Sequence, residues 1–103
     1  MDPRRVLTPA ETAGELVGTA FVHVGDRLDC AYTTADFAAS VRLLDAVAVE
    51  AEAAGHHPDV RLGWGRIAFE LSSHDVGGVT ARDLALARRI DELARAAGAE
   101  PGN

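Results

Sequence analysis

The 103-residue chain is 48% hydrophobic and 25% charged, the composition of an ordinary soluble globular protein, and it is long enough for one two-layer core. Its formal net charge of -6 disfavours nucleic acid as a partner, because such binding depends on clustered Lys and Arg. All 10 basic residues are Arg, which excludes Schiff-base chemistry, pyridoxal phosphate attachment and a phosphate-loop lysine.

The sequence carries no signal for export or membrane insertion. No apolar run approaches the roughly 18 residues of a membrane span, and the segment after Met1-Asp2-Pro3-Arg4-Arg5 is polar, unlike a secretory leader. Cys30 is the only cysteine, which excludes an internal disulfide and a thiolate metal cage. We therefore expect a cytoplasmic protein with a single domain over residues 1–103, and the bias towards Arg and Ala is typical of a GC-rich bacterial genome.

A short helix and a hairpin are expected first. Thr8-Pro9-Ala10-Glu11 is a capping box with Pro at the first helical position, so a helix begins there and fades at Gly18. Apolar and polar residues then alternate on both sides of Gly25-Asp26, which is the pattern of a hairpin with one buried face. We place its strands at about 19–24 and 27–33.

A longer helix follows the hairpin. Thr33 or Thr34 can cap it, with Asp36 in its first turn. Apolar residues then recur at helical spacing until Gly55, which is a natural terminator.

The last third of the chain predicts a second strand pair and a final helix. Apolar residues alternate over 60–64 and again over 67–71, as in half-buried strands. Asp75-Val76-Gly77-Gly78 makes a tight turn, and Thr80 with Asp83 caps the last helix.

This order of elements indicates an α+β fold of two layers. We expect a four-stranded antiparallel sheet covered on one face by three helices, in the order αββαββα, and a frayed tail over 99–103. The other sheet face and the open strand edges are left for self-association, because both are liabilities in a monomer.

Three of the 4 histidines lie where the backbone changes direction. His56 and His57 fall between helix and strand, and His74 falls between strand and helix, which are positions where functional sites are often built. Because His57 precedes Pro58, its backbone is pushed towards extended geometry, so the first two imidazoles point in different directions. One hairpin separates His57 from His74, so the three rings can share one pocket.

The same residues have other interpretations. Adjacent loop histidines can simply be solvated, with His74 capping a turn. Three histidines and a water can also bind zinc, although a His pair before Pro lacks the helical i, i+4 spacing of many zinc sites. His23 alternates within a strand, as a structural or exposed residue would, and Cys30 is typical of a buried core thiol.

Two segments resemble the pterin-4a-carbinolamine dehydratase family. They are AEAAGHHPD at 51–59 and LSSHDVGGVTARDLALA at 71–87, within a likeness that covers about residues 35–94. The specific features are the paired histidines before Pro, the Ser-preceded His after the hairpin, and the glycine-containing turn into a Thr-x-Arg-Asp helix. The resemblance implies dehydration of a 4a-hydroxytetrahydropterin to the quinonoid dihydropterin, without a metal or redox cofactor, in a homodimer or homotetramer.

The resemblance also implies roles for individual residues. His56 and His74 would be the proton-transfer pair, and His57 would bind and orient the pterin. Imidazole can act as acid or base at neutral pH, because its reference pKa is near 6.5. Glu52 would orient an imidazole or meet the donor edge of the pterin, unless it is a solvated helix-end carboxylate. The remaining substrate-binding candidates are Ser73, Asp75 and Arg82. Asp75 would hold the tautomer of His74, unless it only makes the turn. Arg82 would line the site, unless it is simply an exposed arginine.

Four positions depart from the family pattern: Val60 stands where many members have Trp, Trp64 replaces a frequent Tyr, Gly55 replaces a frequent Asp or Asn, and Phe21 lies where a pocket Trp would be expected. Loss of these contacts would weaken pterin stacking. The second hypothesis is therefore a non-catalytic assembly or binding module, or a dehydratase for a different heterocycle.

Overall fold

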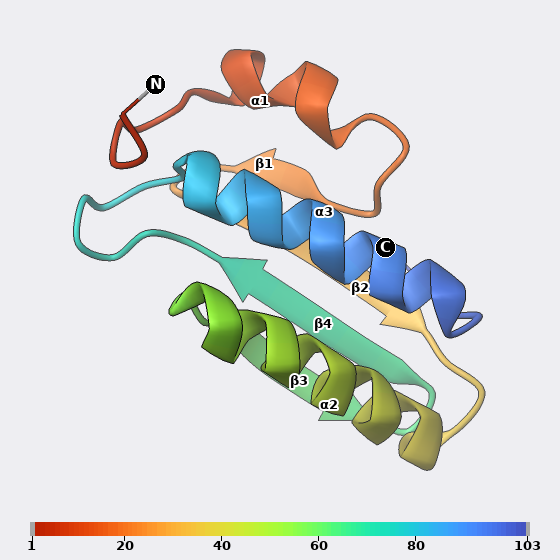
Figure 1. Cartoon of the computed structure of the whole chain (residues 1–103). Coiled ribbons are helices and arrows are strands. Elements are labelled where there is room, and N and C mark those ends of the chain that lie inside the picture. Colours follow the sequence, from red (N-terminus) through yellow and green to blue (C-terminus); the bar gives the residue numbers. More distant parts are fainter. Residues whose placement is uncertain (1, 103) are drawn as a thin grey trace.

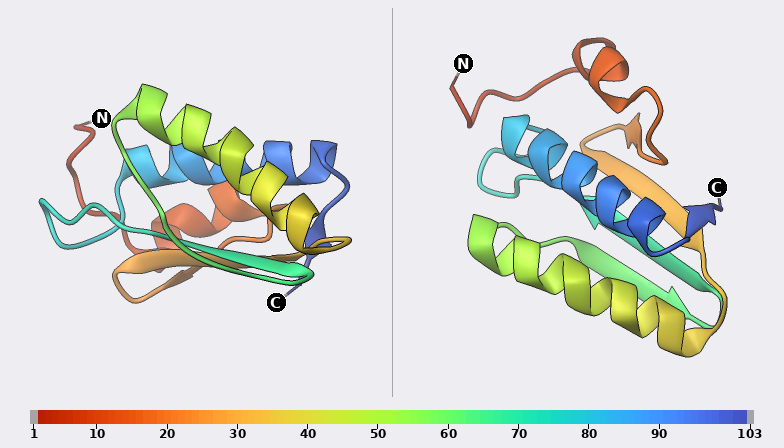
Figure 2. Two further views of the ribbon diagram at one scale, coloured as in Figure 1. Left: turned by 90° about the horizontal axis from the view of Figure 1, so that it is seen from below. Right: turned by 45° about the vertical axis from the view of Figure 1, so that its right-hand side comes forward.

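A computed structural model describes residues 2–102 as three helices packed on one face of an antiparallel sheet (Figure 1). Figure 2 shows the layers in its left view, with the sheet edge-on and the helices all on one side. The elements are α1 (Pro9–Leu16), β1 (Val22–Val24), β2 (Arg27–Thr33), α2 (Phe37–Ala54), β3 (Asp59–Gly63), β4 (Arg66–Leu71), α3 (Ala81–Ala96) and β5 (Glu100–Pro101). The predicted α+β class and the order αββαββα are confirmed, with β5 as an addition. No helix of the described chain is both long and apolar enough to cross a membrane.

The sheet has the strand order β1-β2-β4-β3, and each neighbouring pair is antiparallel. β2 and β4 form its centre. Their register pairs buried residues on the helix-covered face: Leu28 with Leu71, Cys30 with Phe69, and Tyr32 with Ile67. Burial raises the pKa of the Cys30 thiol to about 12, so Cys30 is a protonated core residue, as expected.

The helix caps are those expected from the sequence, with one exception. The capping boxes of Thr8 and Thr80 are both formed, and Gly55 ends α2 in the left-handed conformation at φ 62°. The prediction that Thr33 or Thr34 caps α2 is wrong. The Asp36 carboxylate does so, accepting a hydrogen bond from the Ala39 N–H at 2.8 Å.

Several strand limits also differ from expectation. The first strand begins only at Val22, because the preceding residues are held in a loop that packs on α3. Trp64 lies in the turn after β3 and is 76% exposed. The tail that was expected to fray contacts the sheet in the structure: Ala99 is buried, and the Gly102 N–H donates to the Ala31 carbonyl at 2.8 Å. Position 103 lies outside the described residues.

A buried polar network joins the loop between α1 and β1 to the sheet and to α3. The Asp91 carboxylate accepts hydrogen bonds from the Tyr32 hydroxyl at 2.6 Å, the Ala20 N–H at 3.1 Å and the Arg95 Nε at 2.7 Å. Burial alone would raise the pKa of Asp91, but these donors outweigh it and hold the pKa below its ordinary value. The network is far in sequence from the candidate histidines and serves the fold.

Candidate acid/base site

The predicted site residues gather at one end of the molecule. The C-terminal end of α2, the start of β3, the end of β4 and the start of α3 meet there (Figure 1). Gly55 reverses the chain after α2, and the His56 N–H still donates to the Ala51 carbonyl at 3.2 Å. The imidazole of His56 therefore leaves the end of α2 in the direction of α3.

His56 is held by a buried carboxylate. Its Nε2 lies 2.5 Å from Asp83 Oδ1, and its side chain is only 14% exposed. The other carboxylate oxygen of Asp83 accepts hydrogen bonds from Ser73 Oγ and from the Thr80 N–H, both at 2.8 Å. A carboxylate at Nε2 favours the tautomer that carries its proton there, so Nδ1 is left as an acceptor with no partner among residues 2–102.

His57 forms a separate pair with Glu52. Its Nε2 bonds the Glu52 carboxylate across the last turn of α2, and both side chains are largely exposed. An exposed pair of this kind adds little to stability, so its polar atoms are available to a ligand. The two neighbouring imidazoles thus have different partners, His56 on α3 and His57 on α2.

The loop of His74 is fastened to α3 on both sides of that histidine. Ser73 binds Asp83, and Asp75 accepts a hydrogen bond from Arg82 Nη2 at 2.7 Å. The Asp75–Arg82 pair lowers the pKa of Asp75 and raises that of Arg82, so both stay charged. His74 itself is exposed and has no hydrogen-bond partner in the described chain, so Asp75 does not hold its tautomer in this structure.

A groove of about 440 Å³ runs between α2 and α3, and His56 and Arg82 line it. His57 and His74 do not, so a single pocket shared by the three rings stays a prediction. Since Ser73 and His56 bind the same carboxylate, the loop that carries His74 nevertheless lies next to His56.

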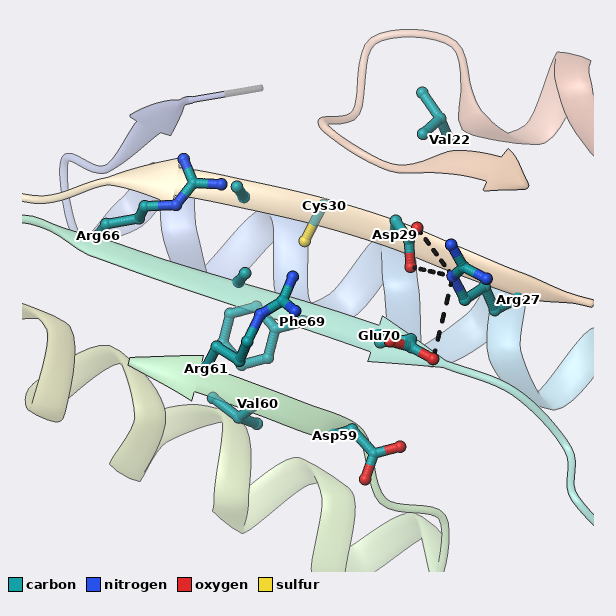
Figure 3. Close-up of a pocket in the computed structure, with 12 residues that line it drawn as sticks. Val22, Arg27, Asp29, Cys30, Asp59, Val60, Arg61, Arg66, Phe69 and Glu70 are labelled. Carbon is teal, nitrogen blue, oxygen red and sulfur yellow. Dashed lines mark hydrogen bonds and ion pairs between the residues drawn. The ribbon is translucent and has the colours of Figure 1, made fainter. Parts of the chain in front are cut away.

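A second hollow, of about 360 Å³, lies on the open face of the sheet (Figure 3). The small residues Ala31 and Ala68, which pair across β2 and β4, line it together with several charged side chains. Arg27 binds Asp29 there at 3.0 Å. No histidine lines this hollow, so it is separate from the acid/base site.

Asp83 is the site residue that sequence reasoning missed. Its role in the capping box was visible from the spacing to Thr80, but its contact with His56 joins residues 27 apart. Of the positions that depart from the family pattern, Phe21 is only 2% exposed and belongs to the core, and Val60 packs against that core. No group of three or more potential metal ligands is found in the described part of the chain.

The protein is thus a two-layer α+β domain with an imidazole–carboxylate pair, His56 and Asp83, at one end of its sheet. The model of the family "Pterin 4 alpha carbinolamine dehydratase" matches residues 7–93. The chain belongs to this family, and the activity that gives the family its name is that of a hydro-lyase.

Bacterial relatives agree with this assignment. A Nocardia farcinica protein is 49% identical over 71 residues, which cover 69% of this chain and 75% of the relative. A Thermosynechococcus vestitus protein is 40% identical over 89 residues, which cover 85% and 94% of the two chains. Both are named as candidate pterin-4-alpha-carbinolamine dehydratases.

Two solved structures share the fold. A transcriptional coactivator/pterin dehydratase from Brucella melitensis matches with a TM-score of 0.80 and 25% identity, covering 87% of this chain and 99% of that one. A pterin dehydratase-like protein identified as a RuBisCO assembly factor in the alpha-carboxysome matches with a TM-score of 0.63 and 25% identity, covering 75% and 92%.

Proposed function

We propose that this protein removes water from a 4a-hydroxytetrahydropterin to give the quinonoid dihydropterin by histidine acid/base catalysis. The observation that carries the proposal is the pair of His56 and the buried Asp83, which leaves Nδ1 of His56 ready to accept a proton. Family membership supports the pterin as substrate.

The chemistry needs one base and one acid. The bond between the ring carbon and its hydroxyl breaks, the hydroxyl takes up a proton and leaves as water, and the neighbouring ring N–H loses a proton as the new C=N bond forms. His56 acts as the base at Nδ1, and His74 on the adjacent loop delivers the proton to the leaving hydroxyl. Exchange with solvent then restores both imidazoles, so no redox step is needed.

The remaining site residues bind and orient the substrate. The exposed His57–Glu52 pair presents polar atoms towards solvent beside His56, where they can meet the donor edge of a pterin. Arg82 and Asp75 fix the loop of His74, and Ser73 fixes it from the other side through Asp83. We further propose that the protein is cytoplasmic and acts as a homodimer or homotetramer.

A test replaces each histidine in turn. The substrate is generated in the cuvette by a coupled aromatic amino-acid hydroxylase, and its dehydration is followed by absorbance. His56→Ala and His74→Ala should each lower kcat roughly 100- to 10,000-fold. His23→Gln is the matched control, because His23 binds Thr12 and lies outside the site. If both alanine variants keep the wild-type rate, histidine catalysis is refuted.

A second candidate function is a non-catalytic assembly module. The likeness to the RuBisCO assembly factor favours it, together with the open sheet face and its hollow. A wild-type protein that binds another protein but neither binds a pterin nor accelerates the dehydration would decide for this alternative.

A further inference from the structure

Thr80 has a contact that a helix cap does not need. Its oxygen caps α3 by accepting a hydrogen bond from the Arg82 N–H at 3.2 Å, as an N-cap residue does. The same hydroxyl also lies 2.9 Å from Ser73 Oγ, on the loop that carries His74. The hydroxyl of Thr8, which caps α1, has no such second partner among the described residues. The contact between Thr80 and Ser73 therefore joins the start of α3 to the His74 loop.

The chemistry of the partners fixes the direction of these hydrogen bonds. The Asp83 carboxylate can only accept, so Ser73 gives it its single hydroxyl hydrogen at 2.8 Å. Ser73 must then accept from Thr80, and Thr80 in turn accepts from the Arg82 Nε at 3.3 Å. All these bonds point one way, from the Arg82 guanidinium through two hydroxyls to the Asp83 carboxylate. Hydrogen bonds aligned in this way polarise and strengthen one another.

Water does not compete for the middle of this series. Ser73 is 1% exposed, and Thr80 and Asp83 are 0% exposed. A buried polar group without a partner is costly, so these side chains have few alternative arrangements. The series of hydrogen bonds is therefore held in one geometry.

The guanidinium end of the series returns to the other side of the same loop. Arg82 Nη2 donates to Asp75 Oδ1 at 2.7 Å, and Ser73 and Asp75 are the two residues that flank His74. The side chains of Ser73, Thr80, Arg82 and Asp75 thus close a polar ring with the backbone of 73–75. The polar ring holds His74 from both sides, and the Thr80 hydroxyl is its junction.

The carboxylate end of the series reaches the other histidine. Asp83 Oδ2 belongs to the series through Ser73, while Oδ1 faces His56 Nε2 at 2.5 Å. Both histidines of the proposed proton-transfer pair are therefore connected to the polar ring.

We propose that Thr80 is a positioning residue for the dehydration, and that its hydroxyl keeps His56 and His74 at the spacing that the reaction needs. The inference rests on the proposed function, because it concerns the same proton-transfer pair. Removal of the hydroxyl takes a donor from Ser73 and an acceptor from Arg82 at once, so both histidines lose a support.

Substitutions at Thr80 separate the hydroxyl from the rest of the side chain. Thr80→Val replaces the hydroxyl with a methyl group of similar size. We expect kcat for the dehydration to fall roughly ten- to hundredfold, since small misplacements of catalytic groups have effects of that size, while KM changes by less than about threefold. Thr80→Ser keeps the hydroxyl and should retain kcat within about threefold. An unchanged kcat in Thr80→Val, or equal losses in the two variants, would overturn the proposal.

Thr8→Val is the matched control for helix capping. It removes the hydroxyl of the other capping box, which lies on α1 outside the site, so kcat should stay at the wild-type value. A loss of kcat equal to that of Thr80→Val, with both proteins folded by circular dichroism, would show that the loss of a helix cap is responsible and would overturn the proposal.

A double variant tests the polar ring itself. Asp75→Ala opens the ring at the ion pair with Arg82 and leaves Thr80 in place. If both groups act through one ring, Thr80→Val/Asp75→Ala should have about the same kcat as Thr80→Val alone. Losses that multiply would show two independent contacts and would contradict the ring.

The polar ring can also be tested without turnover. The imidazole signals in ¹H–¹⁵N NMR spectra report the tautomer and hydrogen bonding of each histidine. Thr80→Val should shift the signals of both His56 and His74, whereas those of His23, which binds Thr12, should not move. If these shifts occur but the wild type does not accelerate the dehydration, the ring stands and the proposed function fails. Unchanged signals of His56 or of His74 would overturn the ring whatever the activity.

Discussion

Asp83 uses its two oxygens for two different tasks. Oδ1 faces His56 Nε2, while Oδ2 accepts from Ser73 and from the backbone of Thr80. One buried carboxylate thus holds the imidazole of His56 and the loop that carries His74, the two residues of the proposed proton-transfer pair. In the proposed mechanism Asp83 is a positioning residue, since its effect on the reaction would run through the groups it holds.

Replacing Asp83 with Asn should expose this role. The amide keeps the volume but turns one acceptor into an NH2 donor that faces other donors. We expect kcat to fall roughly ten- to hundredfold, because small misplacements of a catalytic group have effects of that size. KM should change less. Steady-state kinetics with circular dichroism as the folding check tests this, and a kcat within twofold of wild type would contradict it.

Asp91 should make stability depend on pH. Its pKa is below the ordinary value in the folded protein, so its contribution is present above the unfolded pKa of about 3.9 and is lost as pH falls through the folded pKa. We expect Asp91→Asn to cost about 1–3 kcal/mol at pH 7 and less at pH 3, since the contribution of the charge falls as the pH drops below the unfolded pKa. Urea unfolding at both pH values measures this, with the exposed Asp45→Asn as control. A loss that does not shrink at pH 3 would show that the charge is not responsible.

At the residue scale, the sequence located the histidines and offered Glu52 as a residue that orients an imidazole, which the His57–Glu52 pair agrees with, but it did not give the partner of His56. The direction change at Gly55 and the restraint from Pro58 are local effects, so they could be predicted. The bond from His56 to Asp83 depends on how α3 packs beside α2, which no local spacing encodes. The same holds for Asp75, whose partner is Arg82 and not His74.

The N-terminal segment and the loop of His74 form a contact that only glycine permits. A Cβ at Gly78 would lie 2.7 Å from Val6 Cγ1, and the Leu7 N–H donates to the Val79 carbonyl at 2.8 Å. The segment before α1 therefore braces the loop that precedes α3.

A pair of substitutions tests this bracing. Gly78→Ala should destabilise the protein by about 1–3 kcal/mol through overpacking. Val6→Ala removes the obstructing methyl groups, so the same change should cost less in that background. Thermal unfolding of the wild type, the two single variants and the double variant measures how far the cost of Gly78→Ala depends on the Val6 side chain. Equal costs of Gly78→Ala in both backgrounds would show that the contact with Val6 is not the cause.

At the element scale, the helix caps could be predicted directly from the sequence, whereas the pairing of strands from distant segments could not. The boxes at Thr8 and Thr80 depend on residues three apart, and both form. β5 is only Glu100–Pro101, which has no alternating pattern, and it pairs with Tyr32 and Thr33 of β2. Because these segments are far apart in the sequence, this pairing could not be predicted from local patterns.

At the scale of the whole molecule, large hydrophobic side chains and two strand edges are exposed. Val49 on α2 is 68% exposed and Phe37 at its start is 52% exposed. β1 and β3 also end the sheet with open edges. Such surfaces favour association with a second copy.

Sedimentation velocity at micromolar concentration should therefore show a dimer or tetramer. Val49→Glu should shift the distribution towards smaller species if α2 contributes to the contact, whereas Glu15→Gln on α1 should not. A wild-type protein that is monomeric at 100 µM would contradict self-association.

At this scale the alternation of apolar residues was sufficient to predict the two-layer α+β fold. A period of two over the strands and helical spacing elsewhere each bury one face, and both faces must meet in one core. The core contains residues from both strand pairs and all three helices, as that argument requires.

The most direct test of the central claim is the rate of 4a-hydroxytetrahydropterin dehydration with and without the purified wild-type protein. We expect micromolar protein to accelerate the reaction well above its spontaneous rate, with no change when a chelator is added. A rate equal to the spontaneous one, with a folded protein confirmed in the same sample, would contradict the assignment of dehydratase activity to this chain.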